Sequence, residues 1–217
     1  MDPHWLDFAQ RLQAIAQSGL AYDPALFDRE RYEQILDIAA EMMATYADVD
    51  IPQIRGLFEA QAGHATPKID TRGVVFREDK ILLVRENMLD NGRWTIPGGW
   101  ADINETPSQT TVREVYEESG YRARAVKLLA LYDRRLHDHP PHIFHIYKAF
   151  FLCELLDDER SQAQIDNTGA AYSETGEVAF FAQDAIPEDL SIGRVTPRQI
   201  QRFFEHLHNP DLPTDFD

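Results

Sequence analysis

The chain has 217 residues, of which 43% are hydrophobic and 11% aromatic, and its 21 basic and 37 acidic residues give a formal net charge of −16. This composition supplies a hydrophobic core and excludes a wholly disordered chain. The length suits a catalytic domain with a small accessory domain. The negative charge opposes extended binding to nucleic acid or to anionic membranes.

The sequence carries no sign of a membrane segment or of a signal peptide. Its longest apolar run, residues 149–153, is far shorter than the roughly 18 residues of a membrane helix. The first residues lack a basic segment followed by an apolar stretch. The single cysteine, Cys153, cannot form an internal disulfide, which favours a reduced compartment. We therefore expect a cytoplasmic protein with no membrane partner.

Residues 1–62 show the periodicity of helices. Apolar side chains recur every three or four residues from Trp5 to Ile15 and again from Tyr32 to Met43, and a third short helix is predicted over 52–59. No catalytic grouping occurs in this part of the sequence. We expect a small helical domain that dimerises or caps the rest of the chain, followed by a linker over 62–68.

From residue 66 to 208 the pattern changes to that of strands interrupted by two helices. Strands are predicted over 72–76, 81–85, 125–132, 143–155 and 178–181, and helices over 107–119 and 197–206. Strands mixed with few helices indicate an α/β or α+β sandwich. The last residues, 209–217, are polar with two prolines, and we expect a loose tail.

The helix over 107–119 has strong signals at both ends. Thr106 is placed to cap it, Pro107 occupies the first helical position, and Gln109 completes a capping box. Gly120 is placed to end the helix in a left-handed turn.

Three carboxylates share one face of this helix. Glu114, Glu117 and Glu118 stand at positions i, i+3 and i+4. Such like charges repel, and a helix tolerates them either as a solvated face or because a divalent cation belongs there. Oxygen ligands without histidine or cysteine select Mg²⁺ or Mn²⁺ over zinc.

The spacing around these glutamates is more specific than the face itself. From Gly99 there are five residues to Glu105, seven more to Arg113, and then the run Arg-Glu-Val-Tyr-Glu-Glu-Ser-Gly-Tyr. This stretch resembles the Nudix box, GX5EX7REUXEEXGU, with every specified position filled. Tyr121 stands where aliphatic residues are commoner.

The resemblance extends to most of the chain. Residues 94–100 look like the strand and turn before the box in Nudix hydrolases, and residues 174–181 look like the last strand of that fold. The first sixty residues are similar to the helical extension of a subgroup that includes pyrophosphatases of CDP-choline and ADP-ribose. The resemblance implies a Nudix-type α/β/α sandwich with a mixed sheet, preceded by a small N-terminal helical domain.

The resemblance also implies roles for residues of the box. Glu114, Glu117 and Glu118 match the metal ligands, and the backbone carbonyl of Gly99 joins them. Arg113 matches a residue that pairs with a box glutamate, for which Glu105 is the candidate. The metal, Mg²⁺ or Mn²⁺, would bridge diphosphate oxygens and activate the attacking water, so that Glu117 and Glu118 act at the catalytic centre.

Two further groups of residues are weaker candidates. Residues 133–145 hold four histidines and two arginines, among which Arg134 and Arg135 could clamp a phosphate and His142 could bind a phosphate or ribose hydroxyl. The alternative is a polar loop before a strand. Outside the box, Glu174 is a candidate general base, with Glu177 behind it.

We therefore expect an Mg²⁺-dependent hydrolase of a nucleoside diphosphate linked to another moiety, with CDP-choline and ADP-ribose left as alternatives. We also expect a homodimer, with residues 1–60 in its interface. A second reading is an RNA exonuclease or RNA-end pyrophosphohydrolase, which would depend on basic residues such as Arg134, Arg135 and Lys148. A third is a non-catalytic regulator that binds ADP-ribose, although the box keeps all its glutamates.

Overall fold

The computed structural model describes residues 3–47, 50–86, 92–157, 159–160 and 175–217, and it divides into two compact units. Residues 1–67 and 140–145 make up the helical unit, and residues 68–139 and 146–217 make up the sheet unit. The break after residue 67 falls in the expected linker. The transfer of residues 140–145 to the helical unit was not predicted from the sequence.

Three helices build the helical unit: α1 (His4–Ala21), α2 (Leu26–Ala47) and α3 (Ile51–Glu59). Their contact rests on small residues, because Ala9, Ala16 and Ala39 are fully buried and let the helices approach closely. Gln10 ties the returning segment to α1, since its Nε2 donates to the backbone oxygen of His142 at 2.9 Å. The helical expectation for this part is confirmed.

A mixed sheet forms the centre of the sheet unit. Its strands are β1 (Lys68–Arg77), β2 (Lys80–Glu86), β3 (Trp94–Thr95), β4 (Gly98–Trp100), β5 (Ala123–Asp133), β6 (Ile146–Leu155), β7 (Thr175–Ala182) and β8 (Asp215–Phe216). They run in the order β3-β2-β1-β6-β5-β8, with β4 beside β1 and β7 beside β2. The pairs β1–β6 and β5–β8 are parallel, and the other described pairs are antiparallel.

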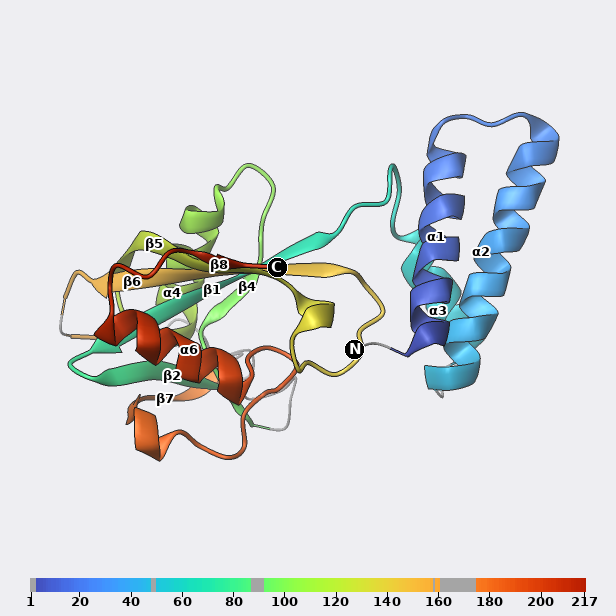
Figure 1. Ribbon diagram of the computed structural model, residues 1–217. Coiled ribbons are helices and arrows are strands. Elements are labelled where there is room, and N and C mark those ends of the chain that lie inside the picture. Colours follow the sequence, from blue (N-terminus) through green and yellow to red (C-terminus); the bar gives the residue numbers. More distant parts are fainter. Residues whose placement is uncertain (1–2, 48–49, 87–91, 158, 161–174) are drawn as a thin grey trace. The chain divides into compact units, whose positions relative to one another are not determined.

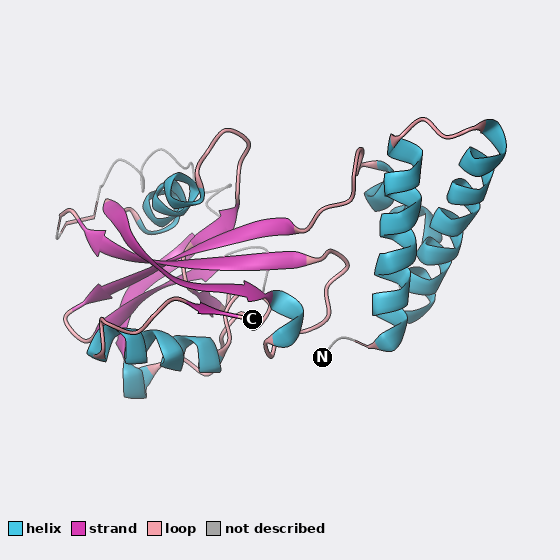
Figure 2. Cartoon of the chain, turned by 45° about the horizontal axis from the view of Figure 1, so that its top comes forward, coloured by secondary structure: helices cyan, strands magenta, loops and turns pink. Residues whose placement is uncertain are grey.

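Two helices cover opposite faces of this sheet (Figure 2). Alternate strand residues point to opposite faces, so Val74 packs in the core with α6 (Pro197–His208), whereas Val75 packs in the core with α4 (Pro107–Ser119). Two short 3-10 turns, η1 (Arg134–Leu136) and η2 (Gln183–Ala185), follow β5 and β7. The expected α/β sandwich with a mixed sheet is therefore confirmed.

Helix α4 has the predicted bounds and the predicted ends. The hydroxyl of Thr106 accepts from the Gln109 backbone N–H at 3.2 Å, and the Gln109 side chain accepts from the Thr106 N–H at 2.8 Å. Gly120 ends the helix with φ +75°, where a side chain would be strained. Gly73 lets α4 pack closely against β1, because a Cβ at this position would lie 2.2 Å from Val115 Cγ2.

The last residues differ from the loose tail that the sequence suggested. Asp215 and Phe216 pair in parallel with Ala130 and Leu131, as strand β8 at the edge of the sheet. Asp215 also accepts two hydrogen bonds from the Arg202 guanidinium, at 2.6 and 2.7 Å. The backbone hydrogen bonds of β8 and this bidentate ion pair offset the loss of conformational entropy when the polar segment becomes ordered.

Candidate active site

The loop before α4 is joined to the helix through one guanidinium. Arg113 donates from Nε to Glu105 at 3.1 Å, and its Nη1 donates to Glu114 and Glu117, each at 2.8 Å. Its Nη2 reaches Asp102 in the loop at 3.1 Å. Hydrogen bonds to Glu105, and then to Glu117 and Glu114, raise the pKa of Arg113 above its ordinary value. The predicted pairing of Arg113 with Glu105 is present in the structure.

Glu118 lies on the same helix but has a different hydrogen-bond partner. Its Oε2 accepts from the backbone N–H of Gly98 at 2.9 Å. Burial raises the pKa of Glu118 to about 7, with Glu114 adding to the rise while Arg72 opposes it. Burial likewise raises the pKa of Glu114. These two carboxylates are therefore held where the ionised form is costly unless a cation compensates it.

The two glycines before the loop allow the backbone to approach these carboxylates. Gly98 has φ +148°, and a Cβ there would lie 2.1 Å from the Thr71 oxygen. At Gly99 a Cβ would lie 2.8 Å from Glu114 Oε1. A side chain at either position would therefore displace the strand or the acidic face of α4.

The predicted metal ligands would suit a hard divalent cation, because all of them are oxygen atoms: the carboxylates of Glu114, Glu117 and Glu118 and the backbone carbonyl of Gly99. Within the described residues, however, no three His, Cys, Asp or Glu side chains gather around one point. Arg113 occupies Glu114 and Glu117 instead. A cation bound here would have to compete with Arg113 for these two carboxylates.

The three predicted substrate-binding residues lie in different parts of the structure. Arg134 is buried in the sheet unit, where its Nε lies 3.4 Å from the Gly193 oxygen. Arg135 pairs with its neighbour Asp133, at 2.8 Å from Nη2 to Oδ2. His142 belongs to the helical unit and lines a pocket of about 380 Å³ there, with residues of its three helices. Of the three, only Arg134 is buried.

Only one of the two candidate bases lies among the residues that the structure describes. Glu174 falls outside the residues that the structure describes. Glu177 lies on β7 with an exposed side chain, and its Oε1 accepts from Arg85 Nη1 at 3.3 Å.

Sequence reasoning missed a buried ionic group beside the box. Asp70 and Arg72 on β1 and Lys148 on β6 are 7%, 3% and 1% exposed. Arg72 donates from Nε to Asp70 at 2.9 Å and from Nη1 to the Ile96 oxygen at 3.1 Å, and Lys148 pairs with Asp70. The available signal was the presence of charged residues within strands whose other residues are largely apolar.

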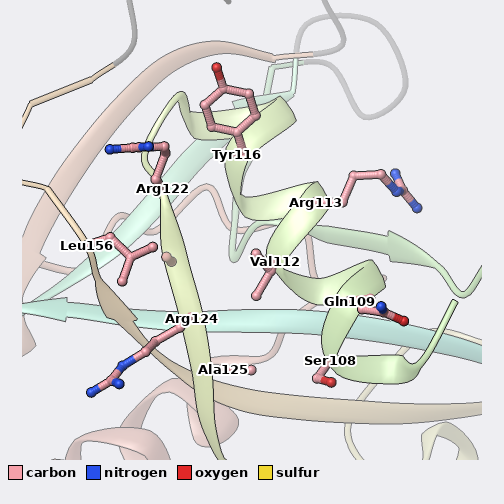
Figure 3. Close-up of a pocket in the computed structure, with 10 residues that line it drawn as sticks. Ser108, Gln109, Val112, Arg113, Tyr116, Arg122, Arg124, Ala125 and Leu156 are labelled. Atoms are coloured by element: carbon pink, nitrogen blue, oxygen red, sulfur yellow. The ribbon is translucent and has the colours of Figure 1, made fainter.

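A separate pocket of about 570 Å³ lies between α4 and β5 (Figure 3). Val112, Arg113 and Tyr116 line it from the helix and Leu156 from beyond β6, and the Arg113 side chain extends from the helix away from β5. The pocket therefore adjoins Arg113, which also makes the ion pairs of the box.

Two family models match the chain and together cover most of it. Residues 67–199 match the NUDIX domain. The chain belongs to the Nudix family. Residues 3–58 match a second model, described as a UDP-X-like, N-terminal oligomerisation domain. Both parts of the expected resemblance are thus confirmed, and the protein is a Nudix hydrolase.

Similar proteins cover either nearly the whole chain or about 70% of it. A Bacillus subtilis (strain 168) protein, YjhB, named as a candidate ADP-ribose pyrophosphatase, is 44% identical over 98% of this chain and 97% of its own. A solved UDP-X diphosphatase is 29% identical, with a TM-score of 0.59 over 98% of both chains. A Streptococcus suis 89-1591 ADP-ribose pyrophosphatase is 36% identical, with a TM-score of 0.59 over 70% of this chain and all of its own.

Membership in the Nudix family indicates the class of reaction that the site carries out. Nudix hydrolases act with divalent metal ions on nucleotide-linked substrates, which agrees with the oxygen donors on α4. Among the described residues, no helix combines the length and the apolar character needed to cross a bilayer.

Proposed function

We propose that the protein hydrolyses the diphosphate bond of a nucleoside diphosphate linked to another moiety, of the ADP-ribose or UDP-X class, and releases a nucleoside monophosphate and a phosphorylated product. The observation that carries this proposal is the 44% identity to the YjhB protein across both units, under a name that gives ADP-ribose as the substrate. The UDP-X diphosphatase, similar over the same length, supports UDP-linked substrates as the second class.

The contacts within the box support the proposed hydrolysis, because they hold its carboxylates in place. Arg113 holds Glu105 of the loop against the helix, and the Gly98 N–H holds Glu118. We propose Mg²⁺ as the ion, because the donors are hard oxygen atoms. When bound, it would neutralise charge on the diphosphate and lower the pKa of the attacking water. Glu114, Glu117 and Glu118, with the Gly99 carbonyl, would hold it. Glu174 remains our proposed general base, with Glu177 as the alternative.

The test is product release from a panel of ADP-ribose, UDP-glucose, CDP-choline, a nucleoside triphosphate and short RNA, each with Mg²⁺, with Mn²⁺ and with excess chelator. We expect the highest kcat/KM for ADP-ribose or UDP-glucose and no turnover in chelator. A higher kcat/KM for CDP-choline would move the substrate class to choline-linked nucleotides. A higher value for the triphosphate or for RNA would contradict the proposal.

We also propose that the protein is a cytoplasmic homodimer whose interface includes the helical unit. The match of residues 3–58 to an oligomerisation domain supports the dimer. Large apolar side chains remain exposed on that unit, at Phe8, Ile15, Tyr22, Leu26, Phe27, Ile38, Tyr46, Ile51 and Leu57. Cys153, a buried free thiol, agrees with a reducing compartment.

A further inference from the structure

Two neighbouring threonines near the start of α4 use their hydroxyl groups in different ways. Thr110 and Thr111 are both fully buried. The Thr111 hydroxyl donates to the backbone oxygen of Pro107 at 2.7 Å, which is a bond that threonine commonly makes within a helix. The Thr110 hydroxyl donates instead to Oε2 of Glu105 at 2.8 Å, in the loop before the helix. Thr110 therefore ties the box loop to α4.

Glu105 accepts hydrogen bonds from two residues of α4. Residues 102–104 before it are exposed, whereas Glu105 is partly buried. Its two oxygens face one edge of the Arg113 guanidinium, at 3.1 Å from Nε to Oε1 and 3.1 Å from Nη2 to Oε2. The same Oε2 accepts the Thr110 hydroxyl. A carboxylate with donors on two sides is held in one orientation, so Thr110 helps to fix the plane in which Arg113 lies.

The remaining nitrogen of the Arg113 guanidinium lies against two of the predicted metal ligands. Its Nη1 donates to Glu114 and Glu117, each at 2.8 Å. A divalent cation that binds these carboxylates has to displace this nitrogen, and the bidentate pair with Glu105 retains Arg113 when Nη1 gives way. The more firmly Glu105 is held, the less Arg113 competes with the cation.

We propose that Thr110 is a positioning residue of the active site: by holding Glu105 in place, it keeps Arg113 on Glu105 and frees Glu114 and Glu117 for a divalent cation. This role rests on the proposed function, because it takes these two carboxylates as ligands of a metal-dependent hydrolase. Loss of the hydroxyl should therefore weaken binding of the cation. The alternative is a hydrogen bond that serves the stability of the fold alone.

The experiment is calorimetric titration with Mn²⁺ of Thr110→Val and of Thr111→Val, which is the matched control. Each change removes one buried hydroxyl and one hydrogen bond from α4, so a purely structural role predicts similar losses of thermal stability and equal affinity for Mn²⁺. We expect Thr110→Val to raise the Kd for Mn²⁺ about ten-fold, and Thr111→Val to leave it within about two-fold of the wild-type value. Equal Kd values for the two variants would overturn the proposal.

A double-mutant cycle tests whether Thr110 acts through Glu105. Glu105→Ala removes the acceptor of the hydroxyl and should itself weaken Mn²⁺ binding. Adding Thr110→Val to Glu105→Ala should cause no further loss, whereas independent effects would multiply. Thr110→Ser keeps the hydroxyl and should bind Mn²⁺ within about three-fold of the wild type. A multiplied loss in the double variant, or a Thr110→Ser protein that binds as weakly as Thr110→Val, would contradict the proposal.

Hydrolysis assays separate this role from the proposed function. We expect Thr110→Val to raise the Mg²⁺ concentration for half-maximal rate about ten-fold, with kcat and KM at saturating Mg²⁺ close to the wild-type values. Wild-type protein that binds Mn²⁺ but hydrolyses nothing in the substrate panel would contradict the proposed function, and the Mn²⁺ titrations would still decide the role of Thr110. Turnover of ADP-ribose with the same Mg²⁺ dependence in Thr110→Val and in the wild type would refute the role of Thr110 and leave the function standing.

Discussion

Glu118 shows how a functional carboxylate works against the stability of its own fold. Its pKa is about 7 in the folded protein against an ordinary value of 4.5. Between these values the folded state binds more protons than the unfolded state, so this residue lowers the free energy of unfolding as pH rises from 4.5 to 7. The loss is complete above pH 7, unless a bound cation compensates the charge.

We predict that Glu118→Gln raises the free energy of unfolding at pH 8, in the presence of chelator, by about 1–2 kcal/mol. The same change should abolish most hydrolysis, because it removes an anionic oxygen next to Gly98. Urea unfolding at pH 5 and pH 8 checks the stability, and the stabilising effect should shrink at the lower pH. A variant less stable than the wild type at pH 8 would show that the hydrogen bond to Gly98 outweighs the cost of the buried charge.

At the scale of elements, the contact of α4 with β1 determines where the box glutamates lie. The helix sits over Gly73, where the space for a side chain is filled by Val115. Because α4 carries its glutamates on a rigid frame, a small displacement of the helix moves all of them together.

We predict that Gly73→Ala lowers the free energy of unfolding by about 1–3 kcal/mol through overpacking, and lowers kcat more than ten-fold through displacement of α4. Gly56→Ala is the control, since its Cβ would meet nothing within 4 Å on helix α3. It should stabilise the protein by about 0.5–1 kcal/mol and leave kcat unchanged. Chemical denaturation and steady-state kinetics measure both, and equal kcat for the two variants would refute this account of Gly73.

At the scale of the whole molecule, the helical unit presents apolar side chains that its own core does not bury. Phe8 and Ile15 are separated by seven residues on α1 and are 50% and 55% exposed. A seven-residue spacing places both on one stripe of the helix, which is the arrangement of a helix–helix interface between subunits.

We predict that the wild-type protein is a dimer and that Phe8→Asp with Ile15→Asp yields a monomer. Two buried carboxylates facing two others across a symmetric interface would be strongly unfavourable. Light scattering measures the mass, and circular dichroism confirms that the exposed substitutions leave the helices intact. Arg11→Gln, on an exposed position of the same helix, should remain dimeric. A double variant that stays dimeric would place the interface elsewhere.

The sequence by itself determined the features that depend on local signals. The fixed spacing from Gly99 to Gly120 identified the box, and the capping residues Thr106 and Gln109 gave α4 its bounds. The helical start of the chain followed from apolar periodicity. These signals are readable because neighbours within four residues on a helix act on each other whatever the rest of the chain does.

Tertiary structure alone decided which distant residues meet. Lys148 lies 78 positions from Asp70, and only the parallel register of β1 with β6 puts their charges together. Strand β8 and the return of residues 140–145 to the helical unit were likewise invisible, because each depends on partners far along the chain. Strand register and side-chain pairing are set by the whole packed core, and no local pattern in the sequence encodes them.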